Sequence, residues 1–407
     1  MGNIIVGQSG GPTAVINASL AGVFKGGKDN GIKVYGMVNG IQGLLEEKYV
    51  CLDDKIKTDL DLELLKRTPS AFLGSCRYKL PNVGENDEIY KKIFDILEKL
   101  DVDKFFYIGG NDSMDTIKKL YTYSIQNNKN IKFIGVPKTI DNDLAVTDHT
   151  PGFGSACKYI ATTIKEIIKD ATVYDAKNVT IIEIMGRNTG WLTACAAITK
   201  SDDCDGVDFI YLPEVVFDIE DFVKKVAHLQ KTKKSIVIAT SEGIKNKNGI
   251  NICEIEEENT LLDCFGHKSL SGTANTLAKI LHKQLGCKTR AIELNTTQRC
   301  ASHCMSETDM NESFFAGVFA VTLALKGESG KVVVFERISN NPYKIEMKGH
   351  DVYQIANFEK KVPVEWIDTQ NATVCKELLD YIKPLIQGEV YPIMVDGLPK
   401  HLKLNRV

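Results

Sequence analysis

The chain has 407 residues, of which 43% are hydrophobic and 25% are charged, and its formal net charge is -3. This length allows two domains, each with its own core, and the composition is ordinary for a globular protein. The nearly balanced charge excludes a broad basic surface for nucleic acid or for an anionic membrane, so any bound anion must be held by local groups.

The eleven cysteines are scattered along the chain without a CxxC pair. This pattern is typical of reduced, mostly buried thiols in a cytosolic compartment. Cys300, His303 and Cys304 could be taken for metal ligands, but no second pair completes a structural zinc site. The sequence also lacks a basic leader, an apolar signal segment and an apolar run of membrane-spanning length. We therefore expect a cytoplasmic protein with neither a membrane nor a nucleic acid as its partner.

The N-terminal segment has the pattern of a strand, a glycine turn and a helix. The strand Asn3 to Val6 leads into the turn Gln8-Ser9-Gly10-Gly11-Pro12, and a helix follows from about Ala14 to Phe24. Gly10 and Gly11 would present bare backbone amides to an anion. A glycine pair after a strand is also often only a connection.

Another strand is expected around Lys33 to Val38, followed by a polar connection that leads to Arg77 and Lys79. These two cations come directly after a glycine turn. An arginine at such a place can hold two phosphate oxygens in its fork, although a solvated surface arginine is an equally good interpretation.

The stretch from Lys104 to Asp143 carries two loops at the ends of successive strands. The strand Lys104 to Ile108 ends in Gly109-Gly110-Asn111-Asp112-Ser113, and the strand Ile131 to Val136 ends in Pro137-Lys138-Thr139-Ile140-Asp141-Asn142-Asp143. A helix between the strands, for which Ser113 is a candidate cap, makes a βαβ unit with parallel strands. Both loops should then meet at one sheet edge, where a cation, a hydroxyl and carboxylates suit a phosphate site with a base beside it.

The second half of the chain repeats the alternation of strands and helices. After the break at Thr150 to Ala156 a helix runs to about Asp170, and strands are expected at 179–184, 209–212, 235–240 and 289–294. A helix at 310–325 and a strand at 331–335 follow, and the tail from Lys360 shows no chemistry. We expect an α/β fold with two similar three-layer domains and mostly parallel sheets, and an active site in the cleft between them.

These loops together resemble the phosphofructokinase family over nearly the whole chain and in the family's order. The resemblance is carried by Gly10-Gly11, Gly109-Gly110, Thr139 to Asp143, Met185-Gly186-Arg187, Glu242 and Gln298-Arg299. It implies transfer of a phosphoryl group to the 1-hydroxyl of fructose 6-phosphate. It also implies a donor-binding domain of residues 1–150 plus about 298–355 and a sugar-phosphate domain of residues 151–297. A tail of residues 356–407 would pack on both.

Family roles can be placed on the matching positions. Asp141 resembles the base that takes the proton from the sugar hydroxyl, and Thr139 and Asp143 shape the same loop. The positions that resemble the family's sugar-phosphate contacts are Met185, Gly186, Arg187, Glu242, Thr296 and Arg299. Arg290 resembles a further sugar-phosphate arginine that a neighbouring subunit often supplies. Gly10, Gly11 and Arg77 match the donor-phosphate contacts.

Asp112 and Lys138 address the choice of phosphoryl donor. Family members that use ATP resemble GGDGS and PGTIDND, with glycine at both of these positions. An aspartate at 112 would bring charge and bulk toward the space of the ATP α-phosphate, while Lys138 would offer a cation to inorganic pyrophosphate. Similar pairs mark the pyrophosphate-dependent branch of the family, so the sequence predicts a pyrophosphate-dependent phosphofructokinase that works reversibly in glycolysis.

The chain departs from the family pattern at three places. Asn111 replaces the aspartate usually assigned to magnesium, so Mg²⁺ would keep an oxygen ligand there and lose one charge. Thr296 stands where a histidine or tyrosine is usual in the sugar site. Asn178 occupies the place of a second cross-subunit arginine.

Two other functions remain open on the sequence alone. One is an ATP-dependent 6-phosphofructokinase that tolerates Asp112, and the other is a silent regulatory subunit that binds sugar phosphates. The presence of Asp141 favours an enzyme. A sugar site completed by a neighbour's arginine predicts a homo-oligomer, at least a dimer.

Overall fold

The computed structural model describes residues 2–173, 175–255 and 271–404. The chain forms two compact units. Unit 1 contains Met1–Ser155, Arg299–Lys360 and Leu385–Val407, and unit 2 contains Ala156–Gln298 and Lys361–Pro384.

The expected tail of residues 356–407 does not form a body of its own, because its parts belong to different cores. In unit 2, Tyr381 packs against Trp191 with their ring centroids 5.3 Å apart. In unit 1, Val390 is buried in a cluster with Met305 and Met310. Residues 361–384 of the tail therefore belong to unit 2, and the parts before and after them belong to unit 1.

Unit 1 is built on a seven-stranded sheet with the order β11-β10-β5-β4-β1-β2-β3. Its strands are β1 (Asn3–Gln8), β2 (Val34–Met37), β3 (Tyr49–Cys51), β4 (Val102–Gly109), β5 (Lys132–Pro137), β10 (Lys331–Asn340) and β11 (Tyr343–Asp351). The five central strands are parallel, while β3 and β11 pair antiparallel at the two edges. The parallel centre follows from the helices that connect its strands.

Alternate residues of the central strands enter two separate cores, one on each face of this sheet. Phe106 and Ile108 of β4 belong to one core, and Phe105 and Tyr107 belong to the other. Because successive side chains of a strand point to opposite faces, a strand buried on both sides reads as one continuous apolar run. Unit 1 thus has three layers.

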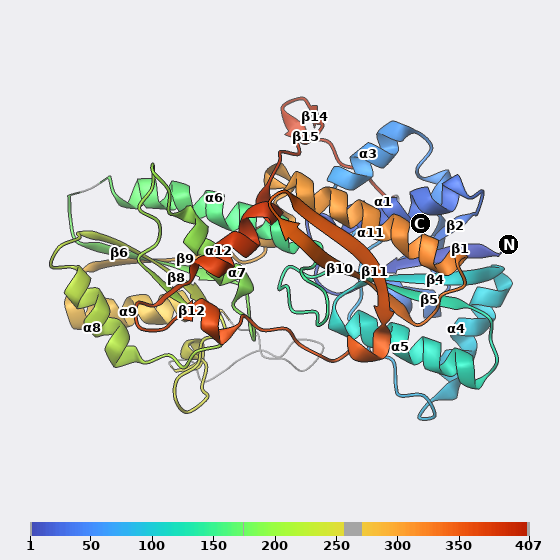
Figure 1. The fold of residues 1–407 in the computed structure, drawn as a ribbon, viewed down its shortest axis with the longest axis horizontal. Coiled ribbons are helices and arrows are strands. Elements are labelled where there is room, and N and C mark those ends of the chain that lie inside the picture. Colours follow the sequence, from blue (N-terminus) through green and yellow to red (C-terminus); the bar gives the residue numbers. More distant parts are fainter. Residues whose placement is uncertain (1, 174, 256–270, 405–407) are drawn as a thin grey trace. The chain divides into compact units, whose positions relative to one another are not determined.

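Helices cover both faces of the sheet in unit 1 (Figure 1). They are α1 (Ile16–Asp29), α2 (Gly40–Leu45), α3 (Asp59–Arg67), α4 (Asp87–Lys99), α5 (Asn111–Gln126) and α11 (Glu307–Leu325). Residues of α1 and α11 join the core of Phe106, whereas residues of α2, α4 and α5 join the core of Phe105. Helix α5 begins at Asn111, directly after Gly110, and no side chain caps its N-terminus. The expectation that Ser113 caps this helix is therefore wrong, since Ser113 is a buried residue of its first turn.

Two glycines allow α1 and α11 to pack closely. A Cβ on Gly22 of α1 would lie 2.0 Å from the carbonyl oxygen of Phe314, and a Cβ on Gly317 of α11 would lie 2.2 Å from the carbonyl oxygen of Ser19. Both distances are too short for a Cβ atom, so a side chain cannot be placed at either position without moving the helices. The close approach of the two backbones therefore depends on both glycines.

Unit 2 is built on a four-stranded parallel sheet with the order β7-β8-β6-β9. Its strands are β6 (Asn178–Ile184), β7 (Phe209–Tyr211), β8 (Ser235–Ser241) and β9 (Lys288–Glu293). The helices α6 (Phe153–Ala171), α7 (Trp191–Ala194), α8 (Ile219–Leu229), α9 (Thr273–Leu285) and α12 (Lys376–Ile382) belong wholly or mainly to this unit. The four-residue helix α10 (Thr297–Cys300) lies where the chain passes from unit 2 to unit 1.

Short two-stranded pairs and one disulfide complete the fold. The pairs are β12 (Ile367–Asp368) with β13 (Thr373–Val374) and β14 (Met394–Val395) with β15 (Leu398–Pro399). Cys157 and Cys195 form a disulfide in unit 2, so the expectation of reduced thiols is wrong for these two residues. In the part of the chain that the structure describes, none of the helices has the length and apolar character needed to cross a membrane.

We expect the replacement of Gly317 by alanine to lower the free energy of unfolding. Alanine is the better helix former by about 1 kcal/mol, so helix propensity alone would favour the variant. The added Cβ would meet the Ser19 carbonyl at 2.2 Å and the Val23 amide nitrogen at 2.7 Å, which forces the helices apart. We expect this overpacking to cost about 2 kcal/mol, and urea denaturation of the two proteins would measure the difference.

The matched control is Asn311→Ala on the exposed side of the same helix. This change should alter the stability by less than about 0.5 kcal/mol. A Gly317→Ala protein as stable as the original would contradict the close packing of α1 and α11.

Candidate active site

Three of the predicted loops meet at one edge of the sheet in unit 1. The strands β1, β4 and β5 are adjacent and parallel, so the turns that follow them lie at the same end. Gly109 lies directly opposite Pro137 in the register of β4 and β5. This confirms the predicted βαβ unit, and it places Gly10-Gly11, Gly109 to Asp112 and Lys138 to Asp143 side by side.

Lys138 buries its ammonium group in the Gly10-Gly11 turn. Its side chain is 3% exposed, and Nζ donates a hydrogen bond to the Gly11 carbonyl oxygen at 2.5 Å. Gly10 has a φ of 76° in the left-handed region, and a Cβ there would lie 3.3 Å from Nζ. Glycine at this position thus permits both the turn and the approach of the lysine.

Two arginines lie close to the same turn. A Cβ on Gly11 would be 3.2 Å from Nη1 of Arg299, and Nε of Arg299 is buried without a hydrogen-bond partner. The loop before Arg77 is attached to the turn because the Ser75 hydroxyl donates to the Gly10 carbonyl at 2.6 Å. Arg299, which the sequence assigned to the sugar phosphate, belongs to unit 1 and lies beside the Gly10-Gly11 turn.

The pKa of Lys138 reflects the competition of these groups. Burial lowers the pKa to about 8, Asp141 and Asp143 favour the charged form, and Arg299 and Arg77 disfavour it. A cluster of cations at a glycine turn is poised to bind an anion, which would relieve their mutual repulsion. The turn therefore has the chemistry of a phosphate site.

The loop from Thr139 to Asp143 is held by its own polar groups. The Asp141 amide donates to the Thr139 hydroxyl at 3.1 Å, and the Thr150 hydroxyl donates to the Thr139 carbonyl at 2.8 Å. Asn142 has a φ of 54°, a left-handed conformation that asparagine tolerates better than most residues. This tight turn places Asp141 and Asp143 on a fixed backbone.

Asp141 and Asp143 influence each other's charge. Burial, together with the nearby charge of Asp141, raises the pKa of Asp143 to about 7. Oδ1 of Asp143 is buried without a hydrogen-bond partner. A pair of carboxyl groups in which one tends to hold a proton is typical of acid and base chemistry.

Asn111 and Asp112 occupy the first turn of α5 in different environments. Asp112 is exposed, whereas the Asn111 side chain bonds to a distant segment. Its Nδ2 donates to the Phe358 carbonyl at 2.9 Å, and its Oδ1 accepts from the Asn357 amide at 3.0 Å. Within the described residues no group of three or more histidine, cysteine, aspartate or glutamate side chains is arranged to hold a metal ion.

In unit 2 the predicted sugar-site loops follow the adjacent parallel strands β6 and β8. The Gly186 amide donates to Oε1 of Glu242 at 3.4 Å, and the Met185 amide donates to Oε1 of Gln298 at 3.4 Å. Gln298 follows β9 on the other side of β6. Three strand ends of unit 2 therefore converge on the Met185-Gly186-Arg187 turn.

Arg187 lies against the loop after β8. A Cβ on Gly243 would lie 1.9 Å from the Arg187 carbonyl oxygen, so only glycine allows this contact. Nε of Arg187 is buried without a hydrogen-bond partner. A buried guanidinium nitrogen that lacks a partner is well suited to an anionic ligand.

Thr296 and Arg290, two further predicted sugar-site residues, belong to strand β9 and the loop after it. Thr296 is exposed in the loop after β9. Arg290 lies within β9, opposite Thr180 of β6, and its guanidinium pairs with Asp170 on the surface at 2.9 Å. Asn178, which also departs from the family pattern, donates a hydrogen bond from its side chain to the Ser235 hydroxyl of the same sheet at 2.6 Å.

Sequence reasoning missed three buried or partly buried charged residues. Glu183 accepts hydrogen bonds from the Ala274 and Gly272 amides at the start of α9, and burial raises its pKa to about 7. Glu214 accepts from the Gly190 amide at 2.8 Å and from the Val362 amide at 3.1 Å. Lys360 bonds to the loop that begins at Thr139, although no local motif surrounds it.

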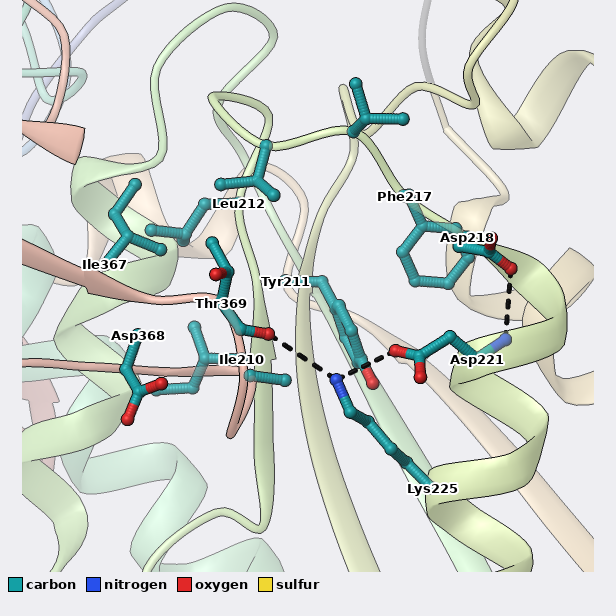
Figure 2. A pocket seen from close by; sticks show the side chains of 13 residues that line it. Ile210, Tyr211, Leu212, Phe217, Asp218, Asp221, Lys225, Ile367, Asp368 and Thr369 are labelled. Carbon is teal, nitrogen blue, oxygen red and sulfur yellow. Dashed lines mark hydrogen bonds and ion pairs between the residues drawn. The ribbon is translucent and has the colours of Figure 1, made fainter.

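A pocket in unit 2 lies apart from all predicted site residues (Figure 2). It is lined by the end of β7, the start of α8 and the segment from Ile367 to Ala372. Figure 2 shows Lys225 between Asp221, at 2.8 Å, and the Thr369 carbonyl, at 3.5 Å. Asp221 and Lys225 thus pair with each other, and Asp218 accepts from the Glu220 and Asp221 amides at the start of α8.

Comparison with known proteins places the chain in a family. The phosphofructokinase family model matches residues 3–324. A pyrophosphate–fructose 6-phosphate 1-phosphotransferase of Xanthomonas campestris pv. campestris is 38% identical, and the match covers 100% of this chain and 97% of the relative. A second enzyme of that name, from Halomonas elongata, is 37% identical over 99% of this chain and 96% of the relative.

A solved structure agrees with these relatives. The pyrophosphate-dependent phosphofructokinase of Nitrosospira multiformis superimposes with a TM-score of 0.89 and 34% identity, covering 100% of this chain and 97% of the other. The family match extends over both units and includes all the predicted site residues, from Gly10 to Arg299. The chain belongs to the phosphofructokinase family.

Proposed function

We propose that this protein reversibly transfers a phosphoryl group from inorganic pyrophosphate to the 1-hydroxyl of fructose 6-phosphate, giving fructose 1,6-bisphosphate and phosphate in glycolysis. The observation that carries the proposal is the buried ammonium of Lys138 in the Gly10-Gly11 turn. Enzymes of the family that use ATP are expected to have glycine at this position. The two relatives described above bear the name of the pyrophosphate-dependent activity.

Asp141 is the proposed base. Its carboxylate would accept the proton of the 1-hydroxyl as the oxygen attacks phosphorus. Asp143 holds a proton more readily than an ordinary aspartate because burial raises its pKa to about 7. Charge repulsion at Asp141 is smaller when Asp143 is protonated, which leaves the pair with one carboxylate for this task.

Lys138, Arg77 and Arg299 are the proposed donor-site cations in unit 1. Their charges, together with the amides of Gly10 and Gly11, would bind pyrophosphate and stabilise negative charge on the departing phosphate. Asp112, exposed in the first turn of α5, would repel an additional phosphate group. Asp112, Lys138 and Asp141 together are therefore the residues that we propose as catalytic.

Unit 2 supplies the proposed sugar-phosphate residues. Met185, Gly186 and Arg187 would bind the sugar phosphate with Glu242 and Thr296, and the unpartnered Nε of Arg187 supports this role. Arg290 is half exposed and pairs with the surface carboxylate of Asp170, which fits a residue offered to a neighbouring subunit. We accordingly propose a homo-oligomer of at least two subunits, and a cytoplasmic location in keeping with glycolysis.

Magnesium is the proposed cofactor. One lone pair of the Asn111 amide oxygen is used by the Asn357 amide, which leaves capacity for a single weak ligand bond. The described residues also lack a cluster of acidic ligands. These groups fit an ion that is held mainly by pyrophosphate oxygens and water, with Asn111 as its one proposed protein ligand. Bound in this way, magnesium would neutralise part of the pyrophosphate charge.

We expect Asp141→Asn to lower kcat by about a hundredfold to ten-thousandfold, because the amide cannot accept the hydroxyl proton. The KM for fructose 6-phosphate should change little. Steady-state kinetics with pyrophosphate and magnesium would measure both constants. The control is Asp95→Asn on the exposed side of α4, and an unchanged kcat in Asp141→Asn would rule out this residue as the base.

The donor assignment is tested by Asp112→Gly combined with Lys138→Gly. The original protein should turn over with pyrophosphate and not with ATP. In the double variant the loss of the Lys138 ammonium should lower kcat with pyrophosphate about a hundredfold or more. Turnover of the original protein with ATP alone would refute the proposed donor and leave the ATP-dependent alternative. A purified chain inactive with both donors would favour the regulatory subunit.

A pH dependence follows from Lys138. Because its pKa in the free protein is about 8, kcat/KM for pyrophosphate should fall above this pH as the ammonium loses its proton. Lys138→Arg keeps its charge throughout the accessible range, so the decline should move to higher pH in this variant. The same alkaline decline in both proteins would show that another group is responsible.

A further inference from the structure

The segment from Asn357 to Lys360 is joined to both catalytic turns of unit 1. At its start, the Asn357 amide and the Phe358 carbonyl bond to the two ends of the Asn111 side chain. The Asn357 side chain also donates to Asp115 of α5 at 2.9 Å. The beginning of α5 is therefore fastened to this segment through side chains as well as through the backbone.

At its other end, the segment pairs with the loop that contains Asp141. Glu359 forms an antiparallel bridge with Leu144, and the Lys360 amide donates to the Asp143 carbonyl at 2.7 Å. The same four residues thus contact the turn after β4 and the loop after β5. Each of these loops carries one of the proposed catalytic carboxylates.

The Lys360 ammonium forms further hydrogen bonds with this loop. Nζ donates to the carbonyl oxygens of Asp148 at 2.5 Å and Thr147 at 3.1 Å, and it lies 3.4 Å from Oδ1 of Asn142. Asn142 is the left-handed residue between Asp141 and Asp143. A cation at this place holds the conformation of the loop through its oxygens.

Charged groups surround Lys360 on the elements that pack against it. Burial lowers its pKa to about 8, Asp148 and Asp143 favour its ammonium, and Arg337 of β10 disfavours it. Asp148 is shared, because it also accepts from Arg337 at 2.8 Å and contacts the buried ring of His149 at 2.8 Å. Lys138 and Lys360 both have Asp143 as a charge partner, so two lysines from distant parts of the chain act on one carboxyl group.

We propose that Lys360 is a positioning residue for phosphoryl transfer, and that its ammonium fixes the loop from Thr139 to Asp148 so that Asp141 meets the hydroxyl of the sugar. The proposal rests on the proposed function, in which Asp141 is the base. The segment Asn357–Lys360 would also keep the Asn111 turn in register with this loop. Lys360 itself does not touch the reacting atoms.

The test compares Lys360→Met, Lys360→Arg and the control Lys344→Met, which removes an exposed lysine of β11. Misplacement of a catalytic group by a fraction of an ångström can lower a rate about a hundredfold, and we expect a loss of this order in kcat for Lys360→Met. The KM for fructose 6-phosphate should remain within about twofold, because its proposed residues are in unit 2. Lys360→Arg should recover most of kcat, since the guanidinium keeps the charge and can donate to the same oxygens.

A second measurement does not depend on activity. Amide hydrogen exchange of peptides from residues 139–148 should be about tenfold faster in Lys360→Met than in the original protein, while peptides from α3 are unchanged. If the original protein lacks activity, the proposed function fails while the exchange data still test the role of Lys360. If Lys360→Met does not fold, Lys360→Gln takes its place, because it also removes the charge.

Three results would overturn the proposal. One is a kcat within twofold of the original in a folded Lys360→Met protein. Another is an equal loss in Lys360→Met and Lys360→Arg, which would assign the effect to packing rather than to the ammonium. The last is exchange in residues 139–148 that does not differ between the original protein and Lys360→Met.

Discussion

The site in unit 1 depends on the burial of one ammonium group. Removing the charge of Lys138 from water is costly unless oxygens and opposite charges surround it. The Gly11 carbonyl provides one hydrogen bond, and Asp141 and Asp143 provide the negative charge that keeps the amine protonated. The glycine turn, the lysine and the two carboxyl groups are therefore mutually dependent, and the register of β4 and β5 brings them together.

The sequence was sufficient for the parts of this arrangement that are local. Strand ends could be predicted because buried parallel strands read as apolar runs bounded by glycines, and Lys138, Asp141 and Asp143 follow directly after such a run. Their meeting with Gly109 to Asp112 could also be predicted, since a helix of ordinary length between two strands makes them parallel neighbours. In unit 2 the family resemblance, rather than strand reasoning, grouped Glu242 with the Met185 turn, and the Gly186 amide contacts Glu242.

Residues that act over long sequence separations could not be found in this way. Lys360 lies in a stretch without periodicity or motif, and only the folded chain brings it to Asp143 and Asn142. The hydrogen-bond partners of Asn111 are on the same distant segment. From the sequence alone, the asparagine at this position could therefore be interpreted only as the loss of a charged metal ligand. The Cys157–Cys195 disulfide and the distribution of the C-terminal tail over the two units could not be predicted either. Each depends on which distant surfaces pack together.

The distribution of charge in unit 1 bears on why a compact anion suits this turn. The positive charges of Arg299 and Arg77 oppose the protonation of Lys138. An anion bound between these cations relieves their repulsion. The gain in binding free energy is largest when the negative charge of the anion is concentrated in a small volume. Pyrophosphate is a small, highly charged anion without an organic group that would need a separate pocket. Under the proposed function, a nucleotide would bring a base and a sugar that the cations at the Gly10-Gly11 turn do not bind, and its additional phosphate would approach the Asp112 carboxylate at the start of α5.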